Sequence, residues 1–323
     1  MKRKSRKGRP AWPESKDRLM GLPIVVDEVW QAGIRRFPGW TKEGGKPSRP
    51  WTVLAVHERG VPVFAATIVP DPPGAEQIWA VLEKAMLEPI SARSHRPAEV
   101  QVCSPQIREG ISLRLEAIGS RCVLREALPG IDAAAKAMEV PFRSEGDRFA
   151  IVLVPGLARE RVAALFAAAA EYYRKRPWTL VESDTIFRVD CARLEKSPWY
   201  AVPIGQEGTH GLAIYDDLEG LRTVIKEELR DQAAFDRTSS VSTLFVPPYE
   251  MPIPDLDAAE AGGWPIAGPQ AHPTVYRIHR GGKIRQPESG EVEAMIVCLR
   301  AVPAFLDGQG VDADPEVKVA RLK

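Results

Sequence analysis

Two stretches of the chain repeat one order of hydrophobic and polar positions. Residues 48–86 and 197–229 each open on a serine followed closely by Pro-Trp, and each continues as two short apolar runs separated by a turn. The turns contain Gly60 and Gly208, and each stretch ends in apolar residues at helical spacing. The pattern predicts a hairpin–helix unit that occurs twice, as if by duplication.

The remaining apolar patterns predict further strands and helices. Period-two or β-branched runs predict strands, and apolar residues at i, i+3 and i+4 predict helices. The expected strands span 22–30, 99–103, 121–125, 185–191, 241–246 and 274–279, and the expected helices span 107–118, 132–138, 158–175 and 292–299. The proline- and glycine-rich segment 252–273 predicts a long loop, and Pro303 is expected to end the last helix.

This mixture of elements predicts an α/β protein of the α+β type, with mixed sheets covered by helices. A length of 323 residues suits two domains, and the polar stretch 141–147 is the expected boundary. The predicted organisation is a disordered basic arm, a first and a second α/β domain, and a frayed tail, over residues 1–18, 19–145, 146–307 and 308–323.

The first half contains part of an RNase H-like order of elements, namely hairpin, helix, strand, helix, strand. Nucleases of that fold place carboxylates on the first strand and at the end of the fourth, because two metal ions must clamp one phosphate. This chain has Glu58 beside its first turn and Ser104 after the strand 99–103. A lone Glu58 cannot hold two ions, so the order predicts at most a degenerate nuclease-like scaffold. A working site would need two of Asp27, Glu58, Asp71 and Glu99 at metal-bridging distance.

Charge and cysteine usage narrow the functional classes. The 44 basic and 43 acidic residues give a net charge of +1, which provides no global field for nucleic acid or membrane. The four cysteines are far apart and form no CxxC motif, so they predict a reduced, cytoplasmic protein. No apolar run approaches the roughly 20 residues that cross a bilayer, and we expect no membrane partner.

The basic N-terminal arm is a candidate nucleic-acid contact. Arg6, Lys7, Gly8 and Arg9 precede a proline, in an order similar to the core of an AT-hook. Lys7 departs from that core, because an ammonium group does not replace a planar guanidinium in a narrow groove. A solvated tail remains the competing interpretation.

The glycine-rich segment 205–211 is a candidate ligand contact through Glu207 and His210. A phosphate loop would have to precede a helix, whereas this segment precedes a strand. We therefore expect a hairpin turn in which Glu207 and His210 face solvent. The five histidines lie without His or Cys partners at ligand spacing, and no nucleotide motif is present, so no metal and no cofactor is predicted.

Two groups of residues resemble families of uncharacterised bacterial domains. Pro177-Trp178, Asp184 and the run from Gly205 to Tyr215 resemble one family. Three groups in the first half resemble a second family often found beside the first: Arg49-Pro50-Trp51, Arg96-Pro97 and the run from Leu128 to Asp132. Together the resemblances cover most of residues 20–306, and they imply two domains but no activity.

The predicted function is therefore non-catalytic: a binding or interaction protein whose partner, a protein or a small molecule, is unknown. The alternative is a nucleic-acid-binding protein or a degenerate nuclease-like enzyme. The basic arm and the RNase H-like order favour that alternative.

Overall fold

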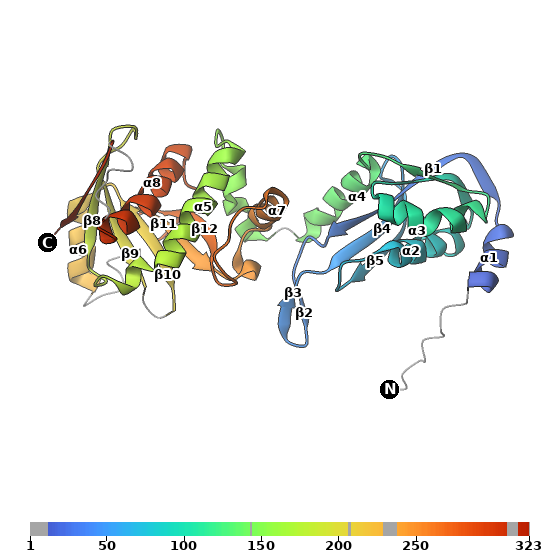
Figure 1. Ribbon diagram of the computed structural model, residues 1–323, viewed down its shortest axis with the longest axis horizontal. Helices are drawn as coiled ribbons and strands as arrows, with labels where there is room; N and C mark the ends of the chain where they lie inside the picture. Colours follow the sequence, from blue (N-terminus) through green and yellow to red (C-terminus); the bar gives the residue numbers. More distant parts are fainter. Residues whose placement is uncertain (1–11, 143, 206–207, 229–237, 309–315, 323) are drawn as a thin grey trace. The chain divides into compact units, whose positions relative to one another are not determined.

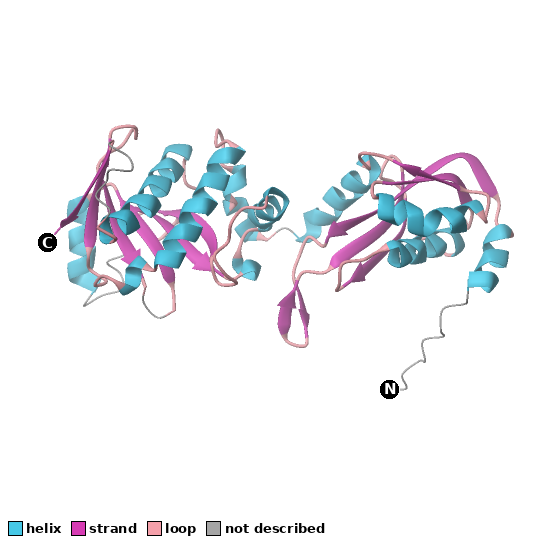
Figure 2. Cartoon of the chain, in the orientation of Figure 1, coloured by secondary structure: helices cyan, strands magenta, loops and turns pink. Residues whose placement is uncertain are grey.

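The computed structural model describes residues 12–142, 144–205, 208–228, 238–308 and 316–322. The chain divides into two compact units, Met1–Arg143 and Ser144–Lys323, and the division falls within the polar stretch 141–147. Both units combine helices with a sheet, as Figure 2 shows. The predicted α+β class is confirmed.

The first unit is organised around a five-stranded sheet with the order β5-β4-β1-β6-β7. Strand β1 runs antiparallel to β4 and parallel to β6, so the sheet is mixed. The elements in chain order are α1 (Trp12–Met20), β1 (Ile24–Arg36), β2 (Thr41–Glu43), β3 (Lys46–Ser48), β4 (Trp51–His57), β5 (Val63–Val69), α2 (Ala75–Leu87), β6 (Arg96–Val102), α3 (Pro105–Glu116), β7 (Arg121–Leu124) and α4 (Pro129–Glu139).

This strand order is the one expected for an RNase H-like sheet, but the first strand is β1 and not the strand that begins at Trp51. Glu58 therefore follows the second strand of the order, which corrects its expected place. The sequence pattern ended β1 at Trp30, because Gly33 follows. In the structure Gly33 lies inside the strand, where a methyl group would press on Ile131 at 3.2 Å, so the glycine allows α4 to approach.

Helices cover both faces of this sheet (Figure 1). Helices α2 and α3 pack on the face of Trp30 and Phe64, whose rings stack at 4.2 Å between centroids. Helix α4 packs on the opposite face, where Leu54 contacts the cluster of Leu128 and Ile131. The hydrophobic core of the unit therefore has two layers, one on each side of the sheet.

The second unit is organised around a seven-stranded sheet with the order β13-β12-β11-β10-β9-β8-β14. All of its described strand pairs are antiparallel, unlike the mixed sheet that was expected. Its elements in chain order are the 3₁₀ turns η2 (Glu145–Phe149) and η3 (Ile151–Leu153), then α5 (Arg159–Lys175), β8 (Ile186–Cys191), β9 (Trp199–Ile204), β10 (His210–Tyr215), α6 (Leu218–Glu228), β11 (Ser240–Val246), α7 (Ile253–Gly262), β12 (His272–Ile278), β13 (Ile284–Arg285), α8 (Ser289–Leu306) and β14 (Val317–Leu322).

The two faces of this sheet differ in their cover. Helices α5 and α8 lie against each other on one face, where Tyr172 stacks near Phe245 and Phe305 meets Phe187 (Figure 1). Helix α6 packs on the other face, where Leu221 joins a cluster with Ala213 and Tyr215.

The predicted hairpin–helix unit is present twice, as β4-β5-α2 and as β9-β10-α6. Each hairpin is antiparallel, and each connection spans five residues, 58–62 and 205–209. Gly60 and Gly208 have φ angles of +86° and +82°, which favour glycine. The turn chemistry read from the sequence is therefore confirmed.

Both predicted disordered ends contain structure. Helix α1 begins at Trp12, inside the expected arm 1–18, and buries Leu19 completely while Trp12 packs edge-on against Trp79. Strand β14 lies inside the expected frayed tail 308–323 and pairs with β8. Apolar contacts with the rest of each unit order these short segments, which have too few residues to be stable alone.

Two proline-containing segments are helical where the sequence predicted a loop or the end of a helix. Helix α7 occupies part of the expected loop 252–273, because Pro254 lies in the first turn, where the helix needs no N–H donor, and Gly263 ends it at φ +60°. Helix α8 continues through Pro303 to Leu306. Val302 and Pro303 are buried, so packing offsets the lost hydrogen bond.

Candidate functional site

Polar side chains form a ladder across the middle of the first sheet. Gln31 on β1 donates to Gln101 on β6 at 3.0 Å, and Gln101 donates to Glu99 at 2.9 Å. Glu99 in turn lies 2.8 Å from Arg121 and 3.5 Å from Arg125. The two glutamines and the glutamate are buried, whereas both arginines are exposed.

The ladder also holds the N-terminus of α4. The side-chain oxygen Oε1 of Gln31 accepts the backbone N–H groups of Gly130 at 2.7 Å and Ile131 at 3.3 Å. These donors have no partner within a helix, so the side chain acts as a cap. A methyl group at Gly130 would lie 2.6 Å from the carbonyl oxygen of Glu58, and only glycine allows this approach.

This arrangement differs from a two-metal centre in its donor chemistry. The first and fourth strands of the RNase H-like order present the neutral carboxamides of Gln31 and Gln101, already hydrogen-bonded, where Mg²⁺ requires carboxylates. Glu99 is paired with two arginines, and Asp27 is exposed on β1. Among the described residues, no group of three or more His, Cys, Asp or Glu side chains could hold a metal ion.

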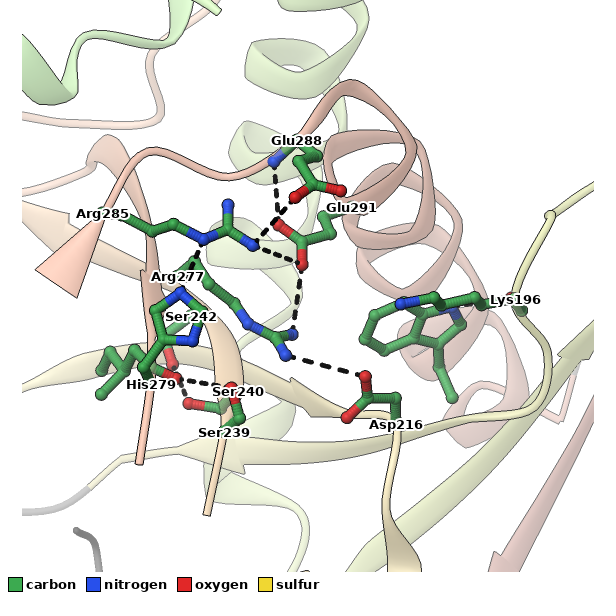
Figure 3. Close-up of polar contacts among 12 residues, drawn as sticks. Lys196, Asp216, Ser239, Ser240, Ser242, Arg277, His279, Arg285, Glu288 and Glu291 are labelled. Atoms are coloured by element: carbon green, nitrogen blue, oxygen red, sulfur yellow. Dashed lines mark hydrogen bonds and ion pairs between the residues drawn. The ribbon is translucent and has the colours of Figure 1, made fainter. Parts of the chain in front are cut away.

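A second polar cluster lies in the second unit, at the end of its sheet where β10 and β12 stop and α8 begins (Figure 3). Arg277 projects from β12 between Glu291, in the first turn of α8, and Asp216, directly after β10. Its guanidinium lies 3.3 Å from Glu291 and 3.7 Å from Asp216. Arg277 and Glu291 side chains are 9% and 8% exposed, and Asp216 is 32% exposed.

Arg285, on β13, is the fourth charged residue of this cluster. Its guanidinium lies 3.2 Å from Glu291 and 3.3 Å from Glu288, and its Nε donates to Nε2 of His279 at 2.7 Å. An arginine Nε–H can only donate, so Nε2 of His279 accepts and carries no proton. His279 is therefore neutral in this arrangement and adds no charge to the cluster.

The sequence of β12 contains one signal for this cluster. Val275 and Arg277 are two residues apart and point to the same face of β12, where both are buried. Arg277 therefore places a charge at a position where the alternating pattern requires an apolar residue. The partners Asp216 and Glu291 come from distant elements, and no sequence motif connects them.

Only one of the candidate residues taken from the sequence, His210, is among the described residues, and it lies outside both polar clusters. Arg6, Lys7, Arg9 and Glu207 fall outside the described residues. His210 is described, and it begins β10 opposite Phe245 rather than standing in the turn.

His210 is also half-buried, not solvent-facing as expected. Its ring lies 4.8 Å from that of Trp178 and 6.4 Å from that of Tyr173. Trp178 also fills the space beside Gly205, where a side chain would overlap its ring. Tyr173 and Trp178, at and just after the end of α5, therefore pack against the second hairpin at His210 and Gly205.

One buried carboxylate has an unusual titration. Asp255 in α7 accepts the backbone N–H groups of Ile151 at 2.8 Å and Val152 at 2.9 Å. Burial raises its pKa to about 6, the two hydrogen bonds oppose that shift, and the nearby Asp147 charge adds to it. Both carboxylate oxygens accept hydrogen bonds from η3, so the Asp255 side chain links α7 to η3.

Fold and site together define a mixed α/β protein with an RNase H-like first sheet and a polar cluster in each unit. Residues 16–139 match the family described as Domain of unknown function (DUF6930). The match covers all five strands of the sheet of the first unit and both layers of its core. No curated protein matches the chain. Within the described part, no helix has the length and apolar character that crossing a membrane requires.

Proposed function

We propose that this is a non-catalytic binding protein whose first unit is a nuclease-like scaffold without nuclease chemistry. The observation that supports this most strongly is the carboxamide pair of Gln31 and Gln101 on the two central parallel strands. Their oxygens and amides hydrogen-bond each other, Glu99 and the start of α4. A ladder with satisfied donors and acceptors stabilises the sheet and offers no free ligand for a catalytic ion.

A cleavage assay tests this proposal. We expect the purified protein to leave single-stranded DNA, duplex DNA, RNA and an RNA–DNA hybrid intact in Mg²⁺ or Mn²⁺. The matched variant is Glu99→Gln, which removes the one buried carboxylate of the ladder. Metal-dependent cleavage by the wild type that is lost in Glu99→Gln would contradict the proposal.

The alternative is nucleic-acid binding through the arm that contains Arg6, Lys7 and Arg9. Such binding would be independent of sequence and would fall steeply with salt, because it comes from counterion release. Truncation should stop at residue 11, since α1 starts at Trp12 and packs on the core. Loss of binding in this truncated chain, with an unchanged melting temperature, supports the alternative.

The proposal includes two domains and a cytoplasmic location. We expect trypsin to cleave between the units after Arg143 and to leave two resistant fragments, because few contacts cross a domain boundary. Cleavage confined to sites inside one of the two units would count against this division. All four cysteines are free thiols in the structure, which suits a reducing compartment.

We also propose that the second unit belongs to a second family of uncharacterised bacterial domains. This assignment is based on the resemblance of Pro177-Trp178 and the run from Gly205 to Tyr215 to that family. The packing of Trp178 against Gly205 and His210 gives those residue types a common structural reason. Homologues of the second unit that have both the tryptophan and a bulky residue at the position of Gly205 would contradict this assignment.

A further inference from the structure

Arg277 is a buried cation whose hydrogen-bonding capacity is largely unused. Its side chain is 9% exposed and carries five N–H donors. Its contacts are the loose ion pairs with Glu291 at 3.3 Å and Asp216 at 3.7 Å. Nε and Nη1 are buried and make no hydrogen bond with any described residue. Because a buried polar group is nearly always hydrogen-bonded, this guanidinium requires another partner.

We propose that Arg277 binds the oxyanion of a small ligand, a carboxylate or a phosphate, and that Asp216 occupies this place when the ligand is absent. A planar guanidinium edge matches two oxygens of such a group, and a bidentate pair is far stronger than a 3.7 Å contact. The Nε and Nη2 edge is the available one, since Nη1 faces Glu291.

Exposure gives the ligand a route to Arg277. Asp216 is 32% exposed and stands on the solvent side of Arg277, directly after β10. Figure 3 shows the Asp216 carboxylate pointing at the guanidinium from the side opposite Glu291, with Lys196 farther across the site. A rotation of the Asp216 side chain toward water would therefore uncover the guanidinium without moving the strand.

Charge balance favours an anion once Asp216 has moved. Arg277 and Arg285 share the single buried carboxylate of Glu291, and His279 is neutral. Glu288 also pairs with Arg285, but it is 75% exposed and its charge is screened by water. With Asp216 turned toward water, the two arginines have only the Glu291 carboxylate between them, and a monoanion on Arg277 replaces the charge of Asp216.

This inference deepens the proposed function, on which it rests, by naming the ligand class of a binding protein. The cleavage assay concerns the first unit alone, so its outcome and the outcome below can be told apart.

The test is melting of the full chain in rising concentrations of sodium phosphate, and separately of sodium acetate, with chloride keeping the ionic strength constant. A bound anion raises the melting temperature in a saturable way. Saturation by phosphate alone or by acetate alone assigns the ligand class. We expect Arg277→Lys to weaken the apparent affinity by about tenfold or more, because lysine cannot form the bidentate pair.

Asp216→Asn is expected to bind the anion about two- to fivefold more tightly, since it removes a competing charge of modest strength. Arg280→Lys is the matched control. Arg280 lies at the same 3.7 Å distance from Asp217, but it is 72% exposed, and this change should leave the affinity unaltered.

Three results would overturn the proposal: no saturable rise in the wild type, the same rise in Arg277→Lys, or no gain in Asp216→Asn. The last variant keeps the test valid if Arg277→Lys fails to fold, because misfolding cannot increase affinity.

Discussion

The two hairpin–helix units have the same local order and different surroundings. Strand β5 ends its sheet and has one neighbour, β4, whereas β10 lies between β9 and β11. The second residue of each of these strands shows the consequence. It is Phe64 in the first hairpin, where the ring fills the core, and Gly211 in the second, where a side chain would overlap the carbonyl oxygen of Thr243.

The tryptophans that open the two units also differ. Trp51 lies on the same face of β4 as Val53 and Ala55, and this face is covered by α2, the helix of its own unit. In β9, Tyr200 and Val202 face α6, and Trp199 therefore points to the opposite face of the sheet. A repeated local pattern therefore fixes a hairpin and a helix, but not which residue faces that helix.

The largest expected effect is at the buried strand. Gly211→Ala places a methyl group against the Thr243 carbonyl in the middle of the sheet, and we expect more than about 4 kcal/mol of destabilisation. Hydrogen exchange measured by mass spectrometry reports each unit separately. Loss of protection in β10 and β11, with the first unit unchanged, is the expected result. An effect below that of Gly60→Ala would break the comparison of edge and central strands.

Gly60→Ala is expected to cost about 2–4 kcal/mol in the first unit. The left-handed φ of +86° strains alanine, and its methyl group would lie 2.9 Å from Ala133 and 3.0 Å from the carbonyl oxygen of Gly130. Urea unfolding monitored by exchange in β4 and β5 measures the change. A cost equal to that of the corresponding change at Gly208 would show that α4 does not restrict this turn.

The units should respond differently to pH. The pKa of Asp255 in the folded second unit is about 6, above its ordinary value, so the folded state binds the proton more tightly than the unfolded state does. Its contribution is fully present below about pH 4 and is lost as pH rises through about 6, by on the order of 3 kcal/mol. Urea unfolding at several pH values should show this slope in the wild type. Asp255→Asn should remove it, and an unchanged slope would assign it to other groups.

Gly208→Ala is the matched partner of the change at Gly60. Its φ of +82° is equally unfavourable for alanine, but a methyl group there meets open space, so we expect only about 1–2 kcal/mol. The difference between the two alanine variants isolates the packing of the first turn against α4. It is measured by the same exchange experiment, now in β9 and β10.

The smallest expected effect is at the histidines of the two hairpins. His210→Ala removes a ring that packs on Trp178, and we expect about 0.5–1.5 kcal/mol. His57 in the first hairpin accepts the Arg59 N–H at 3.2 Å and serves as the comparison. Thermal melting of both alanine variants tests this. A change below about 0.3 kcal/mol at His210 would restore the solvent-facing interpretation.

The sequence by itself determined most of the secondary structure, because apolar periodicity and turn glycines act within a few residues. The stripe of Val162, Leu165 and Tyr172 placed α5 correctly, and Gly60 and Gly208 marked turns with positive φ. It failed where distant packing overrides local preference. Gly33 lies within a strand because α4 needs the space, and Pro303 lies within a helix because its surroundings are apolar.

The candidate site depended on tertiary structure almost entirely. Arg277, Asp216 and Glu291 lie far apart in the sequence, and only the folded second unit brings Arg277 within 4 Å of both carboxylates. The same holds for Gln31 and Gln101, which pair because β1 and β6 are parallel neighbours. A charge at an inner strand position can be read from sequence, but its partners cannot, since electrostatic and hydrogen-bonding energies depend on distances that only the folded chain sets.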